Sequence, residues 1–200
     1  MKRTIDSVID NQDKYHTYTE LNKRRKKALE EGNYIEVVAY DYAMIEDRLL
    51  SILKHLKLIE LNKKKQRYFI KKELEKAFFE FYYSKEEKGK KRNGPEIKNI
   101  STKIKIILLL LEYKKENESL KNMSFILKNV NEEIDLNKEK NILSKWCSKR
   151  DEIIHAMYNK NIQDFDKKIK DIAIEGKNIS YTYSKISRIV KKYLKLTSNK

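Results

Sequence analysis

The side chains most suited to catalysis lie in the segment Arg150-Asp151-Glu152-Ile153-Ile154-His155. Arginine carries a fixed positive charge, and histidine exchanges protons near neutral pH. Metal-free RNA cleavage requires both: one group moves the proton of the 2′-hydroxyl or of the leaving group, and a cation stabilises charge on the phosphorus centre. The segment therefore predicts a site in which Arg150 and His155 act as the catalytic pair.

Helix geometry decides how these side chains can meet. On an α-helix, Arg150 and His155 lie about 140° apart and about 7.5 Å apart along the axis. The long arginine side chain must bend toward a groove that His155 lines, most readily across a symmetric dimer contact. Asp151 and His155 share a face, so the carboxylate can orient the imidazole or raise its pKa. The alternative is structural: Arg150 covers the edge of the core, and His155 completes a surface hydrogen bond.

A second pair with similar spacing is Arg48 and His55, which have six residues between them. A separation of seven places both on the same helical face. Arg48 is followed by Leu49 and lies early in the chain. We therefore rank this pair second.

Several other kinds of site are not indicated. The sequence has no Gly-rich phosphate loop, no paired-cysteine zinc pattern and no HExxH motif, so we expect neither a metal nor a cofactor. With Cys147 alone, no intrachain disulfide can form, which favours a reducing compartment. The first ten residues lack the apolar stretch of a signal peptide. The run Ile106–Leu111 is far shorter than the roughly 20 residues of a membrane span. We expect a cytoplasmic protein with no membrane partner.

The formal net charge of +16 points to an anionic partner, with nucleic acid as the first candidate. An AT-rich genome, which favours lysine, asparagine, isoleucine and tyrosine codons, would give the same composition whatever the function. Both explanations stay open.

The elements that must position these residues are helices, because four glycines and one proline supply too few turns for a many-stranded β fold. Apolar residues recur every three or four positions over residues 34–59, the clearest helical pattern in the chain. Further helices are expected over 20–31 (ended by Gly32), from about Tyr68 to Tyr83, after a Ser101 cap, over 120–130, from an Asp135 cap to about Lys160, over 162–176 (ended by Gly176) and over 179–193.

This pattern predicts an all-α, up-and-down helical bundle that forms a single domain over residues 1–200. Residues 61–99 are expected to form an inserted helical hairpin. Within it, Ser84–Lys98 holds two of the four glycines and the only proline, which indicates a flexible basic loop.

The segment from Arg150 to His155 resembles the R-x4–6-H signature of HEPN domains, small helical modules found in prokaryotic RNase toxins and antiviral nucleases. A polar residue such as Asp151 commonly follows the family's arginine. The segment YIEVVAYDYAMIEDRLLSIL is similar to the family's amphipathic helix that carries a glutamate, here Glu46. The resemblance covers residues 34–60 and 100–175.

The resemblance implies a homodimer that cleaves RNA without a metal at a composite site, in a toxin–antitoxin or phage-defence setting. His155 would be the general acid and base, Arg150 would hold the scissile phosphate, and Asp151 would orient either one. Tyr158, Asn159 and Glu46 would contact the substrate.

The resemblance also implies an antitoxin or nucleotidyltransferase partner. In some relatives a tyrosine two residues after the histidine is modified, whereas Tyr158 follows His155 by three. The alternative function is a non-catalytic basic helical module that binds nucleic acid or a protein.

Overall fold

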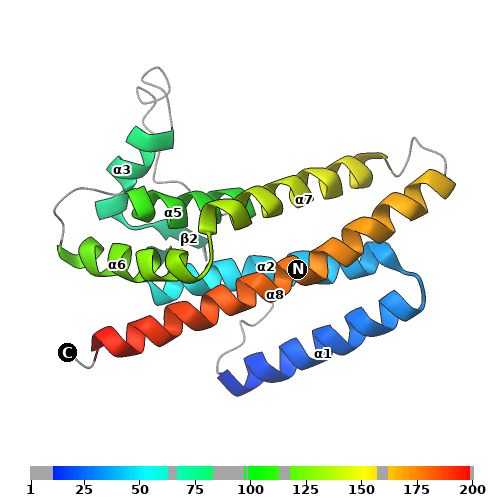
Figure 1. Cartoon of the computed structure of the whole chain (residues 1–200), viewed down its shortest axis with the longest axis horizontal. Coiled ribbons are helices and arrows are strands. Elements are labelled where there is room, and N and C mark those ends of the chain that lie inside the picture. The colour runs from blue at the N-terminus through cyan, green and yellow to red at the C-terminus, as the bar shows by residue number, and fades with distance from the viewer. Residues whose placement is uncertain are drawn as a thin grey trace. The chain divides into compact units, whose positions relative to one another are not determined.

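The computed structural model describes residues 11–62, 67–82, 97, 99–112, 118–156 and 162–198. Within these ranges the chain forms seven helices and one antiparallel sheet of two strands (Figure 1). The helices are α1 (Asn11–Glu30), α2 (Tyr34–His55), α3 (Lys72–Tyr82), α5 (Ile100–Glu112), α6 (Glu118–Glu133), α7 (Leu136–Ala156) and α8 (Ile162–Ser198), and the strands are β1 (Ile59–Asn62) and β2 (Arg67–Ile70). The predicted all-α class is confirmed.

The chain divides into two compact units. Unit 1 comprises Met1–Met44 and Trp146–Ser180, and unit 2 comprises Ile45–Lys145 and Tyr181–Lys200. Helices α2, α7 and α8 each contribute residues to both units. The single domain with an insertion over 61–99 stays a prediction. In the part of the chain that the structure describes, no helix combines the length and the apolar character needed to cross a bilayer.

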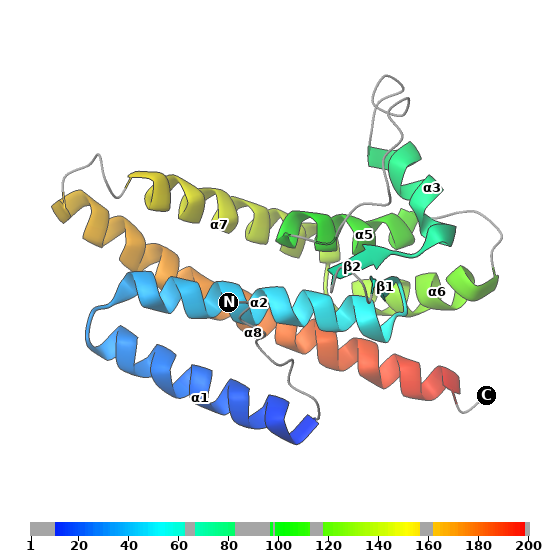
Figure 2. The ribbon, with the colours of Figure 1, turned by 180° about the vertical axis from the view of Figure 1, so that it is seen from behind.

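In unit 1, α1 and α2 are joined by a tight turn at Gly32, as Figure 2 shows. Gly32 has a φ of 75°, the left-handed conformation that glycine adopts without strain. The amide of Asn33 donates to the carbonyl of Ala28 at 2.8 Å, and that of Gly32 donates to Leu29 at 3.3 Å. These bonds satisfy the last carbonyls of α1. The predicted end of this helix is confirmed, although α1 begins nine residues earlier than expected, at Asn11.

Gly176 does not end a helix, so that prediction was wrong. Helix α8 continues through it without a break, from Ile162 to Ser198. A methyl group at Gly176 would lie 2.8 Å from Asp41 Oδ2 and 3.0 Å from Trp146 Cζ2. Glycine is present here because two other side chains approach the helix backbone closely, and not because the chain turns.

In unit 2, the segment after α2 forms a β-hairpin that leads into α3 (Figure 2). Ile59 pairs with Ile70, and Asn62 pairs with Arg67. The sequence predicted a helix from about Tyr68, and an inserted helical hairpin over 61–99. That was wrong for residues 61–62 and 67–70, which form strands, because Tyr68, Phe69 and Ile70 favour strands and the helical periodicity begins only at α3. The predicted loop lies outside the described residues, apart from Ile97.

Two predicted helix caps have different outcomes. Asp135 caps α7 as expected, because its Oδ1 accepts a hydrogen bond from the amide of Lys138 at 3.0 Å. Ser101 does not cap α5. Asn99 does, accepting from the amide of Thr102 at 2.8 Å. Asparagine is at least as good a cap as serine, and here it precedes the first helical residue, Ile100.

The core of unit 2 is almost wholly aliphatic and aromatic. Helix α5 is apolar on most of its circumference, and it packs against α3 and α6. The hydroxyl of Ser124 on α6 donates to the carbonyl of Leu110 on α5 at 2.9 Å. The fully buried side chains of this core include Phe78, Leu49, Ile52, Leu53, Leu56, Leu74, Ile106 and Leu110.

Candidate functional site

The predicted catalytic segment lies on the last two turns of α7, within unit 1. Arg150 is half-buried, with 20% of its side chain exposed, whereas Asp151 and His155 are exposed. The guanidinium of Arg150 lies over the ring of Tyr42 on α2, with Cζ 3.9 Å from the ring centroid. This cation–π contact holds the arginine against a rigid surface.

Asp151 binds Arg150. Its Oδ1 accepts a hydrogen bond from Nε of Arg150 at 2.9 Å and a second, short one from Nη2. Of the two residues that Asp151 was expected to orient, it therefore holds the arginine. Among the described residues, no hydrogen bond or ion pair reaches His155.

The surroundings of Arg150 keep it charged. Partial burial lowers the pKa of Arg150, but the hydrogen bond and the charge of Asp151, together with Tyr42, outweigh that effect and raise the pKa above its usual value. Burial also disfavours the charged form of the thiol one turn earlier, and it therefore raises the pKa of Cys147 to about 11. Cys147 is therefore a protonated, unreactive thiol at neutral pH.

A cavity of about 190 Å³ opens beside Arg150. Its mouth carries two exposed aliphatic side chains, Ile35 and Ile154, each 43% exposed. Arg150 is the only charged residue among its described lining residues, and His155 is not one of them. The lining comes from three helices: Ile35, Val38, Ala39 and Tyr42 of α2, Arg150, Ile153 and Ile154 of α7, and Ile169 and Ile172 of α8.

A wider, more polar depression adjoins this cavity and shares Ile35, Ala39 and Ile169 with it. Its other lining residues include Glu36 and Asp166. The apolar cavity therefore has acidic groups near one side and a single cation on its own wall.

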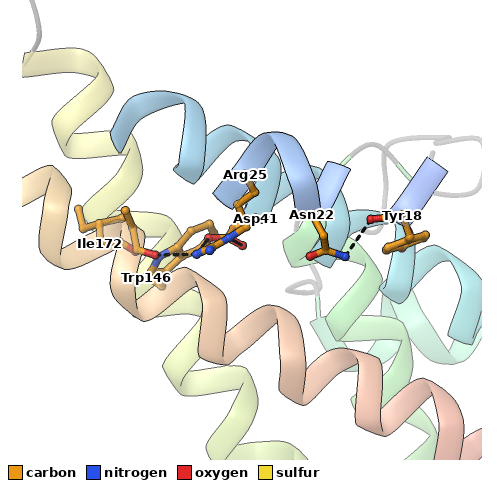
Figure 3. A network of polar contacts seen from close by, with 7 residues as sticks. Tyr18, Asn22, Arg25, Asp41, Trp146 and Ile172 are labelled. Carbon is orange, nitrogen blue, oxygen red and sulfur yellow. Dashed lines mark hydrogen bonds and ion pairs between the residues drawn. The ribbon is translucent and has the colours of Figure 1, made fainter. Parts of the chain in front are cut away.

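A buried polar network fixes the helices that carry this site (Figure 3). Arg25 on α1 and Asp41 on α2 are 5% and 0% exposed. Nε and Nη2 of Arg25 donate to the two carboxylate oxygens of Asp41 at 2.7 and 2.9 Å. Nη2 also donates to the carbonyl of Ala173 on α8 at 3.2 Å. One guanidinium thus joins three helices of unit 1.

Trp146 adds the fourth helix to this network. Its indole nitrogen donates to the carbonyl of Ile172 on α8 at 2.9 Å, and the side chain is 1% exposed. Trp146 therefore lies in the core of unit 1. It stands one turn before Arg150 on α7, and Asp41 directly precedes Tyr42 on α2. The network therefore sets where the Arg150–Tyr42 pair can lie.

The charge state of Asp41 reflects two opposing influences. Burial raises the pKa of Asp41, while the hydrogen bonds and charge of Arg25, and the charge of Lys177, act to lower it; burial prevails. The cost of burying the negative charge of Asp41 is therefore offset mainly by Arg25.

This network was not predicted from the sequence. Arg25 lies inside the basic run KRRKK, and such runs are ordinarily solvated faces of helices. The available signal was Asp41, which occupies the buried row between Val38 and Ile45 on α2. An acid in such a row requires a buried basic partner.

The other predicted residues lie elsewhere or outside the description. Glu46, expected to contact substrate, belongs to unit 2, where it accepts a hydrogen bond from the buried Lys103 at 2.5 Å. Arg48 and His55, the second-ranked pair, are half-buried on the unit 2 part of α2. Tyr158 and Asn159 lie outside the described residues.

Within the described ranges, no three His, Cys, Asp or Glu side chains gather in a way that could hold a metal ion. No known protein family, curated protein or solved structure matches the chain. The similarity to HEPN domains stays a prediction from the segments quoted above.

Proposed function

We propose that this chain is a metal-independent endoribonuclease of the HEPN type, with Arg150 and His155 as its catalytic residues. In this reaction the 2′-oxygen attacks phosphorus and the 5′-oxygen leaves, giving a 2′,3′-cyclic phosphate and a 5′-hydroxyl. His155 takes the proton of the nucleophile or returns one to the leaving group, and Arg150 stabilises the added charge on the phosphate.

The observation that carries the proposal is the state of Arg150. Its guanidinium is held by the ring of Tyr42 and by Asp151, and its pKa is raised, so a fixed cation stands at the edge of an open cavity. Fixed cations stabilise transition-state charge without reorganisation. A bound phosphate would compete with Asp151 for the N–H groups of Arg150.

A homodimer is part of the proposal. Within one chain, His155 does not line the cavity of Arg150. The exposed Ile35 and Ile154 surround the mouth of that cavity, and exposed aliphatic clusters favour association. A second copy that covers this face could bring its own His155 toward Arg150. The toxin–antitoxin or phage-defence setting, the antitoxin or nucleotidyltransferase partner and the cytoplasmic location rest on the sequence alone.

The test is RNA cleavage in excess EDTA by the wild type, His155→Ala and Arg150→Ala. We expect the wild type to cleave, and each substitution to lower the rate by about 100-fold or more. His16→Ala is the matched control, because His16 is also an exposed histidine of unit 1 but has no arginine partner at this spacing. Equal cleavage by the wild type and His155→Ala would reject the assignment, and His55→Ala would be tested next.

A second candidate function is a non-catalytic module that binds nucleic acid or a protein. It is favoured by the pairing of Arg150, whose charge Asp151 already compensates, and by the net charge of +16. RNA binding without cleavage, weakening steeply as salt increases, would support it.

A further inference from the structure

We propose that the isoleucine-rich cavity beside Arg150 binds a small amphipathic carboxylate, with an apolar body of about the size of a benzene ring and its carboxylate paired with Arg150. This site goes beyond the proposed RNA cleavage and does not depend on it. It is assigned from the size, the lining and the single charge of the cavity.

The size and lining of the cavity define the apolar part of the ligand. Seven of the nine described residues that line it are aliphatic, and its volume is about 190 Å³. An aliphatic cavity of about 150 Å³ is large enough to hold benzene, and it excludes water because it offers no hydrogen bonds. A six-membered ring with one further carbon therefore suits this space.

The charge beside the cavity defines the polar part. Arg150 is the only charged residue among the described residues that line it, and its guanidinium lies over the ring of Tyr42. Nε and Nη2 both donate to one oxygen, Oδ1, of Asp151. This edge of a guanidinium matches the two oxygens of a carboxylate. Asp151 is 52% exposed, so it can turn into water when a ligand carboxylate replaces it.

The lining disfavours a nucleobase as the occupant. A base carries N–H and C=O groups on its edges, and apart from Arg150 the described part of the lining offers one polar side chain, Tyr42, for them to bind. Buried polar groups without partners lose binding energy. A carboxylate with an apolar body leaves its polar atoms at Arg150 and places only carbon in the cavity.

The test uses phenylacetate as the probe and the full chain labelled with ¹³C at its isoleucine δ1 methyl groups. Five isoleucines that carry such a methyl group are among the described lining residues of the cavity: Ile35, Ile153, Ile154, Ile169 and Ile172. We expect their resonances to shift with a dissociation constant on the order of a millimolar, as befits a ligand of this size. The methyl groups of Ile45 and Ile52, which lie in unit 2, serve as the internal reference.

Three comparisons separate the two parts of the proposal. Phenylacetamide, which has the same shape without the charge, should bind about tenfold more weakly than phenylacetate, and Arg150→Gln should remove that difference. Ala39→Phe places a ring in the cavity and should weaken phenylacetate at least tenfold. Ala43→Phe is the matched control, since Ala43 is exposed on the same helix but does not line the cavity, and it should bind like the wild type.

Several outcomes would overturn the proposal. They are equal binding of phenylacetate and phenylacetamide, shifts that are no larger in the cavity than in unit 2, and unchanged binding by a folded Ala39→Phe. The alternative occupant of the cavity is a second copy of the chain, and sedimentation tests for it by measuring the oligomeric state. A second copy fills the cavity if Ala39→Phe turns a dimer into a monomer and phenylacetate shifts none of the five methyl groups. Phenylacetate can bind as expected although no RNA is cleaved, and RNA can be cleaved although phenylacetate does not bind. The two proposals are therefore tested separately.

Discussion

In unit 1 a guanidinium and a carboxylate, those of Arg25 and Asp41, lie in the core, and Trp146 and Gly176 complete their surroundings. The core of unit 2 is built from leucine, isoleucine and phenylalanine side chains of α2, α3 and α5. Unit 2 also has an ion pair between Lys103 and Glu46, but the side chain of Glu46 is 33% exposed to solvent. An apolar core tolerates many side-chain arrangements of similar volume, whereas a bidentate ion pair requires one relative geometry of its two side chains. We infer that the geometry of unit 1 is specified more narrowly, and unit 1 carries the candidate site.

The largest expected effect comes from Arg25→Leu, which leaves the buried carboxylate of Asp41 without its partner. Breaking a buried pair in this way costs about 3–5 kcal/mol of unfolding free energy near neutral pH. The pKa of Asp41 is already raised by burial, and the loss of Arg25 raises it further. A carboxyl group whose pKa is higher in the folded state binds more protons there, so the variant regains stability as the pH falls through that raised pKa.

Urea unfolding of the wild type and Arg25→Leu at pH 7 and pH 5 measures this effect. Arg24→Leu is the matched control, because Arg24 is exposed on the same helix and should cost much less. Replacing both partners, Arg25→Leu with Asp41→Leu, should recover most of the loss. A loss that does not change with pH would show that Asp41 is not the group left uncompensated.

The next largest effect is expected in unit 2, from Leu110→Ala. Leu110 is fully buried, and truncating a buried leucine costs about 3 kcal/mol through lost burial and the cavity that remains. No ionisable group is stranded, so this loss should be the same at pH 7 and pH 5. Leu196→Ala, at a position of unit 2 that is 55% exposed, should cost under about 0.5 kcal/mol in the same urea experiment. A pH-dependent loss at Leu110 would contradict the contrast between the units.

The smallest of the three effects is expected from Gly176→Ala, about 1–3 kcal/mol of destabilisation. Alanine favours a helix over glycine by about 1 kcal/mol, which alone would stabilise the protein. We expect a net loss of stability because the added methyl group would be too close to Asp41 and Trp146. Thermal unfolding measures the change. Asn178→Ala, two residues further along α8 and exposed, should be neutral or stabilising. A more stable Gly176→Ala would mean that these side chains can shift away.

Local signals in the sequence predicted local structure well. Gly32 ends α1 and Asp135 caps α7, because each acts on amides and carbonyls within five residues along the chain. The stripe of apolar residues over 34–59 predicted α2, whose packing needs only its own periodicity.

The misses came from contacts between residues far apart in the sequence. Gly176 was expected to be a terminator, but its reason is Asp41, which lies on another helix. Arg25 was treated as a surface charge because its partner is 16 residues away and its third acceptor is at Ala173. Tyr68–Ile70 pairs with a strand whose existence the helical pattern did not indicate.

The candidate site shows the same division. The sequence predicted a helix over Arg150 and Asp151, and both residues lie on α7, where they form an ion pair. It gave no sign of Tyr42 beneath the guanidinium or of the five isoleucines around the cavity, since these come from three helices. His155 does not line the cavity beside Arg150, and the spacing of residues in one sequence carries no information about contacts with a second copy.

The single thiol of the chain has a practical consequence. With its pKa near 11, Cys147 is ionised in only about one molecule in ten thousand at pH 7, so maleimide or iodoacetamide reagents react with it slowly. A cysteine introduced at an exposed position that does not line the cavity, such as Tyr181, would therefore accept a fluorophore or a spin label selectively, with Cys147 left in place. Distances between two such labels would report directly on how two copies of the chain assemble.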